Sequence, residues 1–305
     1  MPAWALISWK PVGLVTLISV RQSPITSSPA RKMPRSRAQG AIASAISRSR
    51  SESGCARAVP PAARLPRVSP ALGMRAIRLS LSHEKIFRAQ LRAILEASYE
   101  NHLDILLPMI SDISEILDAK AILKQEKSRL ERRKKKLGNP KIGAMIEVPS
   151  AVLMVEEIAQ EVDFLCVGTN DLVQYLLGVD RDNELVADWF RTLNPSVLRS
   201  LKMVMNASEK YQKPTIICGE MAGSHVYVPI LLGLGVTELS MHVNAMPRVR
   251  QIISNIAFEE AQTIVKSLET CRTADEVEAT LREHLFTKWA HLYPSTILPP
   301  AKKRV

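Results

Sequence analysis

From about Gly73 onward, short apolar runs alternate with longer amphipathic segments. The short runs are apolar at nearly every position, which predicts strands covered on both faces of a parallel sheet, at 103–110, 141–149, 162–170, 214–220 and 236–242. The longer segments predict helices at 83–100, 114–136, 194–211 and 226–235. Strands and helices that alternate in this way imply right-handed crossovers, and hence a doubly wound sheet or a (β/α)8 barrel.

Polar residues at the ends of these strands favour the barrel. Glu147, Asn170 with Asp171, and Cys218 each lie at the carboxyl end of a different predicted strand. Barrel enzymes carry their catalytic groups at this rim, whereas an open sheet concentrates them at one switch point, usually after a glycine-rich turn. The sequence has no GxGxxG motif. We therefore predict an α/β fold with a TIM barrel over residues 71–250, followed by closing helices and a tail over 251–305.

Residues 1–70 differ sharply in composition. They contain 11 Lys and Arg and a single acid, Glu52, so they account for +10 of the formal net charge of +11. They also hold nine of the 19 prolines and show no sustained periodicity, which predicts disorder. Three explanations remain open: an organelle transit peptide, a signal-peptide core in "VGLVTLISV", or a non-native sequence joined to a real domain. We favour the third, because the composition changes abruptly at "SPALGMRAIRLS".

The charge and cysteine patterns exclude several classes of protein. Because the basic charge is concentrated before residue 71, it does not predict a nucleic-acid-binding face on the folded part. No run reaches the roughly 18 apolar residues that a membrane span needs. The four cysteines show no CxxC or Cys/His ligand spacing, which argues against a structural zinc site or a disulfide framework and suits a reducing cytoplasm.

The residues at the strand ends suggest specific chemistry. Glu147 and Asp171 together can hold a hard divalent cation such as Mg²⁺, although either acid could instead cap the following helix. Arg181 can bind a carboxylate or phosphate, or pair with its neighbours Asp180 and Asp182. Cys218 can be a buried small hydrophobic residue, or a thiol that donates a proton.

Several motifs carry a resemblance to a known family. The stretches "GAMIEVPSA", "VDFLCVGTNDLVQYLLGVDR", "LNPSVL", "ICGEMAG" and "LLGLGVTELSM" resemble the C-terminal barrel of the PEP-utilising enzymes, in particular enzyme I of the bacterial phosphotransferase system. Further stretches favour its nitrogen-related branch. The resemblance implies that Glu147 and Asp171 bind Mg²⁺ and that Cys218 protonates the enolate carbon as pyruvate forms. It also implies that Asn170 and Arg181 bind phosphoenolpyruvate (PEP), and it places Arg75 beside the phosphate site.

The resemblance also implies partners and a missing part. The expected partners are PEP and pyruvate, a phosphocarrier protein that would bind through a domain absent here, and a second copy in a homodimer. Residues 1–70 contain nothing like the first two barrel strands or their "RTLDIGGDK"-type segment. We therefore expect an N-terminally truncated, incomplete barrel, impaired as a fragment. The alternatives are a Mg²⁺-dependent pyruvate or PEP lyase barrel, which needs no thiol acid, and a non-catalytic pseudoenzyme or dimerisation module.

Overall fold

The structure is a computed structural model that describes residues 5–6, 17–20 and 71–293. The chain forms two compact units, residues 1–144 with 161–163, and residues 145–160 with 164–305. Most of residues 1–70, which were predicted to be disordered, lie outside the described residues. The described part of this segment forms two short strands, β1 (Ala5–Leu6) and β2 (Leu17–Val20). Strand β2 pairs antiparallel with β3.

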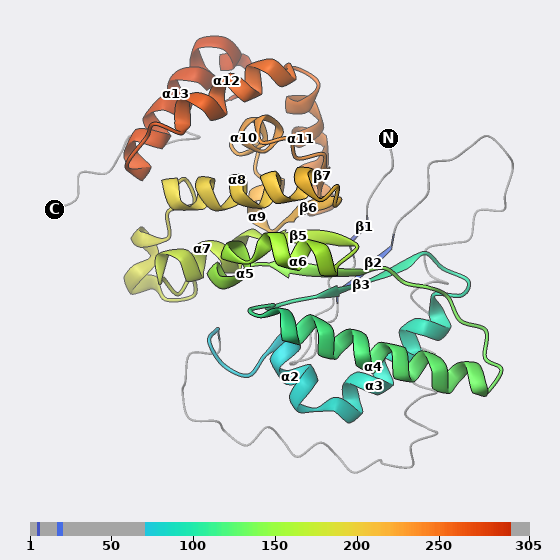
Figure 1. The fold of residues 1–305 in the computed structure, drawn as a ribbon. Helices are drawn as coiled ribbons and strands as arrows, with labels where there is room; N and C mark the ends of the chain where they lie inside the picture. Colours follow the sequence, from blue (N-terminus) through green and yellow to red (C-terminus); the bar gives the residue numbers. More distant parts are fainter. Residues whose placement is uncertain (1–4, 7–16, 21–70, 294–305) are drawn as a thin grey trace, which may run out of the picture. The chain divides into compact units, whose positions relative to one another are not determined.

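The first unit consists of helices packed beside a short parallel strand pair. Strands β3 and β4 run parallel, with Ile105 opposite Ile142. The first of the two long helices, α3, buries Phe87 and Leu91 on its apolar face and lies beside the second, α4 (Figure 1). The elements of this unit are α2 (Ala76–Ser82), α3 (Glu84–Ala97), β3 (Leu103–Leu107), α4 (Ile113–Arg132) and the start of β4 (Ile142–Ile146).

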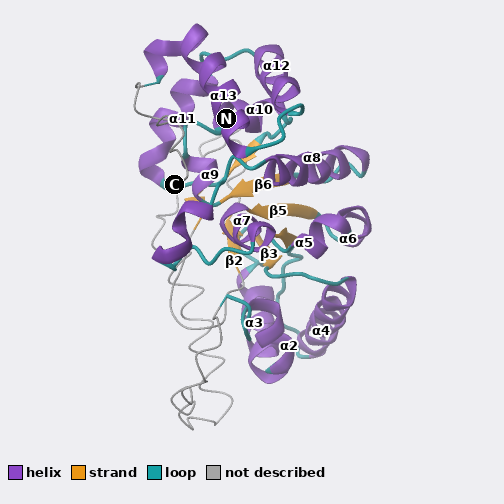
Figure 2. Cartoon of the chain, turned by 90° about the vertical axis from the view of Figure 1, so that its left-hand side faces the viewer, coloured by secondary structure: helices purple, strands orange, loops and turns teal. Residues whose placement is uncertain are grey.

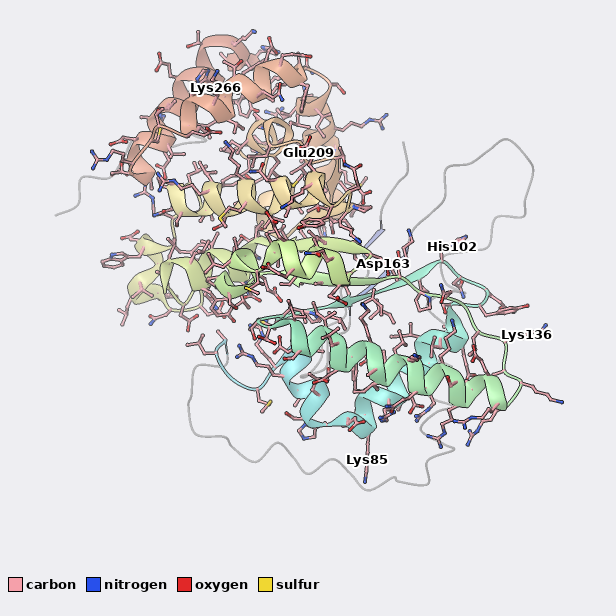
Figure 3. All side chains as sticks on the ribbon, in the orientation of Figure 1. Lys85, His102, Lys136, Asp163, Glu209 and Lys266 are labelled. Carbon is pink, nitrogen blue, oxygen red and sulfur yellow. The ribbon has the colours of Figure 1, made fainter. Side chains whose placement is uncertain are left out.

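The ends of α4 follow its sequence. At its start Asp112 and Glu115 form a capping box, in which each side chain satisfies a backbone N–H of the first turn. At its end the basic run 132–136 is exposed, and Lys136 extends away from the ribbon (Figure 3). This charged run therefore forms a solvated helix end, where the cations face water and the negative end of the helix dipole.

The second unit is built on parallel strands β5, β6 and β7. Val167 of β5 lies opposite Ile217 of β6, and Ile217 lies opposite Leu239 of β7. Figure 2 shows β5 and β6 side by side, with the helices of this unit around them. The elements before the closing helices are α5 (Pro149–Leu153), α6 (Val155–Glu161), β5 (Phe164–Gly168), α7 (Thr169–Leu177), η1 (Glu184–Trp189), α8 (Pro195–Lys210), β6 (Thr215–Cys218), α9 (Glu220–Gly223), α10 (Val228–Gly233) and β7 (Glu238–Leu239).

The closing helices pack into an apolar cluster with α10. Val228, Ile252, Ile264 and Leu281 are fully buried in it, or nearly so. The apolar segment 248–271 forms two helices, which are separated by a turn at 254–257. At the start of the second helix, the Glu260 carboxylate accepts a hydrogen bond from the backbone N–H of Ala257. The elements here are η2 (Val243–Ala245), α11 (Met246–Ile253), α12 (Phe258–Leu268), α13 (Ala274–Trp289) and η3 (Ala290–Leu292).

Thr273 is the N-cap of the last long helix, α13. Its hydroxyl accepts from the backbone N–H of Glu276 at 3.1 Å. The Glu276 carboxylate, however, accepts from the N–H of Arg272 at 2.7 Å, one residue before the N-cap. The two side chains therefore satisfy two backbone donors, the N–H groups of Glu276 and Arg272.

These elements confirm an α/β fold with parallel strands. The incomplete barrel, and the domain boundaries at residues 70 and 250, stay predictions. Among the described residues, no helix combines the length and the apolar character needed to cross a membrane.

Candidate functional site

Gly168, the last residue of β5, is adjacent to two of the predicted site residues. In the parallel pair of β5 and β6 it lies opposite Cys218. A Cβ atom placed on Gly168 would come within 2.6 Å of Oε2 of Glu147, closer than real Cβ contacts come. The Glu147 carboxylate therefore occupies the space that a side chain at position 168 would fill. Two groups that are 71 positions apart in the sequence, Glu147 and Cys218, thus meet at the end of β5.

Glu147 is a buried acid that directly follows β4. Glu147 is 4% exposed. The next helix, α5, begins at Pro149 and has Val148 as its N-cap, with no side-chain cap. The interpretation of Glu147 as a helix cap is therefore wrong, and its burial at a strand end needs another explanation.

Asp171 lies in the first turn of α7 and faces Arg181. The N-cap of this helix is Gly168, without a side-chain cap, so Asp171 is not the capping residue either. Asp171 is 7% exposed, and its Oδ1 lies 3.5 Å from Nη1 of Arg181. The buried side chain of Gln174 accepts a hydrogen bond from the backbone N–H of Arg181 at 3.1 Å. This contact ties the loop after α7 to the helix and positions the Arg181 guanidinium near the acid.

The first residues of α7 also hold the turn that follows Cys218. The Thr169 hydroxyl donates to the carbonyl oxygen of Cys218 at 2.8 Å, and Oδ1 of Asn170 accepts from the N–H of Glu220 at 3.1 Å. Between these two contacts Gly219 has φ +99°, which a residue with a side chain rarely adopts. The turn 218–220 and the start of α7 therefore form one hydrogen-bonded unit. Thr169 was not among the predicted site residues, although a hydroxyl at a strand end is a recognisable signal.

The Cys218 thiol is half-buried and has a second thiol beside it. Cys218 Sγ donates to the carbonyl oxygen of Val167 at 3.2 Å and accepts from Cys166 Sγ at 3.5 Å. Cys166 is buried. The hydrogen bond to Cys218 and its burial raise the pKa of the Cys166 thiol well above its usual range, and the nearby Glu147 charge adds to this shift. Cys166 is thus a neutral hydrogen-bond donor to Cys218, a role that was not predicted from the sequence.

The two acids of the site fit a cation that keeps other ligand positions open. Among the residues that the structure describes, no three His, Cys, Asp or Glu side chains are grouped to hold a metal ion. Glu147 and Asp171 are two buried carboxylates from the ends of β4 and β5, and Mg²⁺ is commonly held by one or two carboxylates plus water and substrate oxygens. Arg75 is the N-cap residue of α2 in the first unit, and its assignment to the phosphate site stays a prediction.

Comparison with known proteins identifies the family. Residues 46–258 match the family described as PEP-utilising enzyme, PEP-binding domain. The chain belongs to this family. Its motifs "GAMIEVPSA", "VGTNDL" and "ICGEMAG" fall within the matched region, so the resemblance stated from the sequence is confirmed.

The relatives of this chain in the PEP-binding family are longer than the chain itself. It is 41% identical over 225 residues to the phosphoenolpyruvate-protein phosphotransferase of Bacillus subtilis (strain 168), an alignment that covers 73% of this chain and 40% of the relative. The protein of the same name from Listeria monocytogenes is 42% identical over 211 residues, which is 69% of this chain and 37% of the relative. Among solved structures, a citrate lyase from Burkholderia xenovorans LB400 has a TM-score of 0.40 at 18% identity, covering 70% of both chains. The chain thus spans about two fifths of the length of these curated relatives.

Proposed function

We propose that this chain binds PEP together with Mg²⁺ at the carboxyl ends of β4, β5 and β6, and that Cys218 is the acid that turns enolpyruvate into pyruvate. The observation that carries the proposal is the meeting of Glu147 and Cys218 at Gly168, beside the helix that bears Asp171. Membership of the PEP-binding family supports PEP as the ligand.

The charges of the site explain why a cation is needed. Glu147 and Asp171 bring two negative charges, and Arg181 brings one positive charge. A phosphate ester would be repelled by this balance, so a divalent cation held by Glu147 and Asp171 is required to attract it. When bound, Mg²⁺ offsets the negative charge that develops on the enolate oxygen.

Arg181 and Asn170 can bind the anionic groups of PEP. The guanidinium of Arg181 lies beside Asp171 and offers several N–H donors in a fixed plane, which match phosphate or carboxylate oxygens. The Oδ1 atom of Asn170 accepts from Glu220, so its NH₂ group is the end that can donate to a ligand. Both side chains would then orient PEP with its methylene carbon toward Cys218.

Cys218 would supply the proton that completes pyruvate. When the phosphoryl group leaves PEP, the enolate needs one proton at its methylene carbon, and a thiol at the strand end can donate it. The thiolate that remains on Cys218 would accept the S–H hydrogen bond of Cys166, which already lies at 3.5 Å.

The wider setting of the activity follows from the family resemblance. In it, PEP gives its phosphoryl group to a histidine of the phosphotransferase, which passes it to a phosphocarrier protein of the phosphotransferase system. We propose the same role for the protein to which this site belongs, as a homodimer in the cytoplasm. Two of the relatives are phosphoenolpyruvate-protein phosphotransferases, which supports this setting.

Calorimetry of the full chain tests the binding site. We expect saturable PEP binding that requires Mg²⁺ and is lost in Asp171→Asn, which keeps the shape of the side chain and removes its charge. The matched control is Asp182→Asn, the same change at an exposed residue of the neighbouring loop. Absence of binding heat in a sample shown to be folded by circular dichroism would refute PEP binding. Binding by Asp171→Asn equal to that of the control would refute the metal assignment.

Proton exchange tests the role of Cys218. In D₂O with Mg²⁺, the methyl protons of pyruvate should exchange in the presence of the protein, as followed by proton NMR. Cys218→Ser should slow this exchange by about 100-fold, the usual contribution of a general acid or base, and leave PEP binding unchanged. The control is Cys271→Ser, because Cys271 is buried in the apolar cluster with the closing helices. Exchange that persists in Cys218→Ser would exclude the thiol as the proton donor.

A further inference from the structure

Cys166 and Cys218 form a pair of thiols on neighbouring parallel strands. Their sulfur atoms lie 3.5 Å apart, although the residues are 52 positions apart in the sequence. We propose that this pair is oxidised reversibly to an intrachain disulfide, which inactivates the site because the Cys218 thiol is consumed. The switch on activity rests on the proposed function of Cys218, whereas the formation of the disulfide does not.

The register of the two strands brings the thiols together. Cys218 lies opposite Gly168, and Cys166 lies opposite Ile216. Because alternate residues of a strand face the same side, Cys166, Gly168 and Cys218 share one face of the strand pair. The contact between the two sulfur atoms, at 3.5 Å, lies on this face.

Bond formation needs a movement of the backbone, because the two cysteines are offset by two residues on neighbouring strands. Such Cα atoms lie about 8 Å apart, whereas a disulfide holds them at about 4.4–6.8 Å. Bonded sulfur atoms lie about 2.0 Å apart, so the two sulfurs must approach by about 1.5 Å. Cys218 is the last residue of β6 and is followed by Gly219, whose φ of +99° ends the strand. For the sulfurs to approach, the end of β6 would have to move against the hydrogen bonds that Thr169 and Asn170 make with the turn 218–220.

The burial of the two thiols determines the order of the reaction. Cys218 is half-buried, whereas Cys166 is 3% exposed, so a small oxidant such as hydrogen peroxide reaches Cys218 first. The Cys218 thiolate attacks one peroxide oxygen, the O–O bond breaks, and a sulfenic acid and water result. The Cys166 sulfur then attacks the Cys218 sulfur, the S–O bond breaks, and the proton of the Cys166 thiol passes to the leaving hydroxide, which departs as a second water. Two thiols and one peroxide give one disulfide and two waters, with two electrons passing from sulfur to oxygen.

Oxidation would switch the site off in a reversible way. A disulfide has no S–H proton to donate, so the oxidised protein would lack the acid that completes pyruvate. It would also protect Cys218 from further oxidation to a sulfinic acid, which thiols do not reverse. A thiol reductant would restore both cysteines and the activity.

Peptide mapping of the full chain tests the disulfide directly. The reduced protein is treated with hydrogen peroxide, its free thiols are alkylated, and it is digested with trypsin without reduction. Trypsin places the four cysteines in four different peptides, 51–57, 142–181, 211–248 and 267–272, so each pairing has its own mass. We expect peptide 142–181 joined to peptide 211–248, lighter by two hydrogens than the two reduced peptides together, and lost on treatment with dithiothreitol.

Two variants sharpen the result. Cys271→Ser should form the same link, because Cys271 belongs to a separate apolar cluster, whereas Cys166→Ser should not form it and should oxidise Cys218 to a sulfinic acid. The wild-type map decides the case even if Cys166→Ser does not fold. The proposal is overturned if Cys166 in the wild type is alkylated while Cys218 is over-oxidised or joined to Cys55.

Activity measurements separate the switch from the proposed function. Pyruvate proton exchange should fall in proportion to the linked fraction and return with dithiothreitol. Full exchange by linked protein would overturn the switch. Absence of exchange in the reduced protein, with the link still formed on oxidation, would refute the role of Cys218 as proton donor and leave the disulfide established.

Discussion

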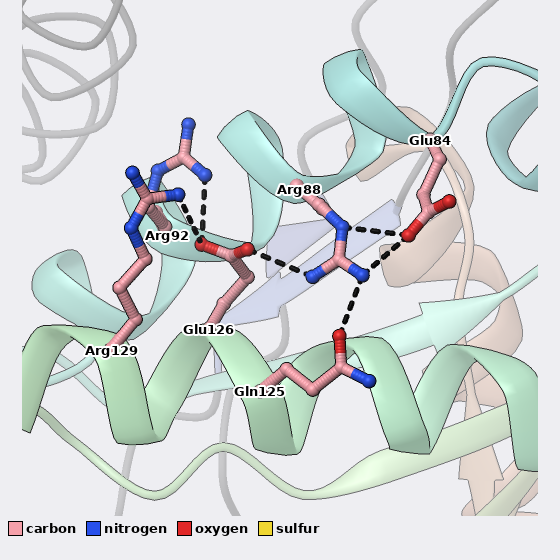
Figure 4. A network of polar contacts seen from close by, with 6 residues as sticks. All are labelled: Glu84, Arg88, Arg92, Gln125, Glu126 and Arg129. Atoms are coloured by element: carbon pink, nitrogen blue, oxygen red, sulfur yellow. Dashed lines mark hydrogen bonds and ion pairs between the residues drawn. The ribbon is translucent and has the colours of Figure 1, made fainter.

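Glu126 is the buried centre of an ion-pair network that joins α3 to α4, and its replacement by Gln is the sharpest test of how the first unit is held together. Glu126 is 2% exposed and accepts from Nη1 of Arg88 at 2.9 Å and from Nη1 of Arg92 at 2.8 Å (Figure 4). Glu126→Gln keeps the size of the side chain and removes its charge. Gln has a single acceptor oxygen, so one of the two arginines loses its hydrogen bond to residue 126.

The size of the effect follows from the burial of each partner. A hydrogen bond to a charged group contributes about 1.5 to 3 kcal/mol, and breaking a fully buried ion pair costs about 3 to 5 kcal/mol. The side chains of Arg88 and Arg92 are 24% and 23% exposed, so water can solvate part of each guanidinium once the carboxylate is gone. We therefore expect Glu126→Gln to destabilise the first unit by about 2 kcal/mol at neutral pH.

The pH dependence of this loss provides a second check. Burial alone would raise the pKa of Glu126, but hydrogen bonds from Arg92 and Arg88 outweigh it and hold the pKa below the usual glutamate value. Because the folded-state pKa is depressed, the charge stabilises the fold above the usual glutamate pKa of about 4.3 and this contribution is lost as the pH falls through the lower folded value. The difference between wild type and Glu126→Gln should thus be constant above about pH 5 and shrink in more acidic solution.

Hydrogen exchange measured by mass spectrometry is the appropriate assay. The chain has four tryptophans, and two of them, Trp189 and Trp289, lie in the second unit, so tryptophan fluorescence does not report on α3 and α4 specifically. Faster exchange should be confined to these two helices. The control is Glu84→Gln, the same change at the 49% exposed end of the network, where we expect at most about 0.5 kcal/mol. Equal exchange in both variants and the wild type would refute the reasoning.

Two further substitutions test local contacts. Gly168→Ala places a Cβ atom 2.6 Å from Oε2 of Glu147 and should weaken Mg²⁺-dependent PEP binding at least about tenfold. In the control, Gly223→Ala, the new Cβ atom meets only side-chain Cβ atoms at 3.3 and 3.4 Å. Equal affinities for PEP in calorimetric titrations of the two variants would contradict the expectation. Thr273→Ala removes the N-cap of α13 and should cost about 1 kcal/mol, seen as faster exchange in its first turn; unchanged protection there would show that the cap contributes nothing.

The strands were predictable because burial on both faces leaves a local signal. Each predicted apolar run contains an observed strand, and β5 is buried at all five positions. Strand β7 is the weakest case, with two residues, Glu238 and Leu239, inside a predicted run of seven. The division of 248–271 into α11 and α12 was not predicted, since both halves carry apolar positions at helical spacing and the break at 254–257 lacks Gly or Pro.

The candidate site was predictable in its residue types but not in its contacts. The strand-end rule located Glu147, Asp171 and Cys218, and the structure brings Glu147 and Cys218 to the same glycine. The choice between a helix cap and a site residue for Asp171 required the observed start of α7 at Thr169. Similarly, the partner of Arg181 is Asp171, ten residues away, and local sequence offered the nearer Asp180 and Asp182 as alternatives.

The sequence by itself determined which residue types end the strands, because the alternation of buried strands and amphipathic helices is written in local hydrophobicity. Only the tertiary structure decided which of these residues meet. Parallel strands are joined by long crossovers, so no turn sets their register, and it is the packing of the strands and helices that places Cys218 opposite Gly168. A shift of one residue in that register would turn Cys166 and Cys218 to opposite faces, and neither the thiol pair nor the proposed acid at the site would exist.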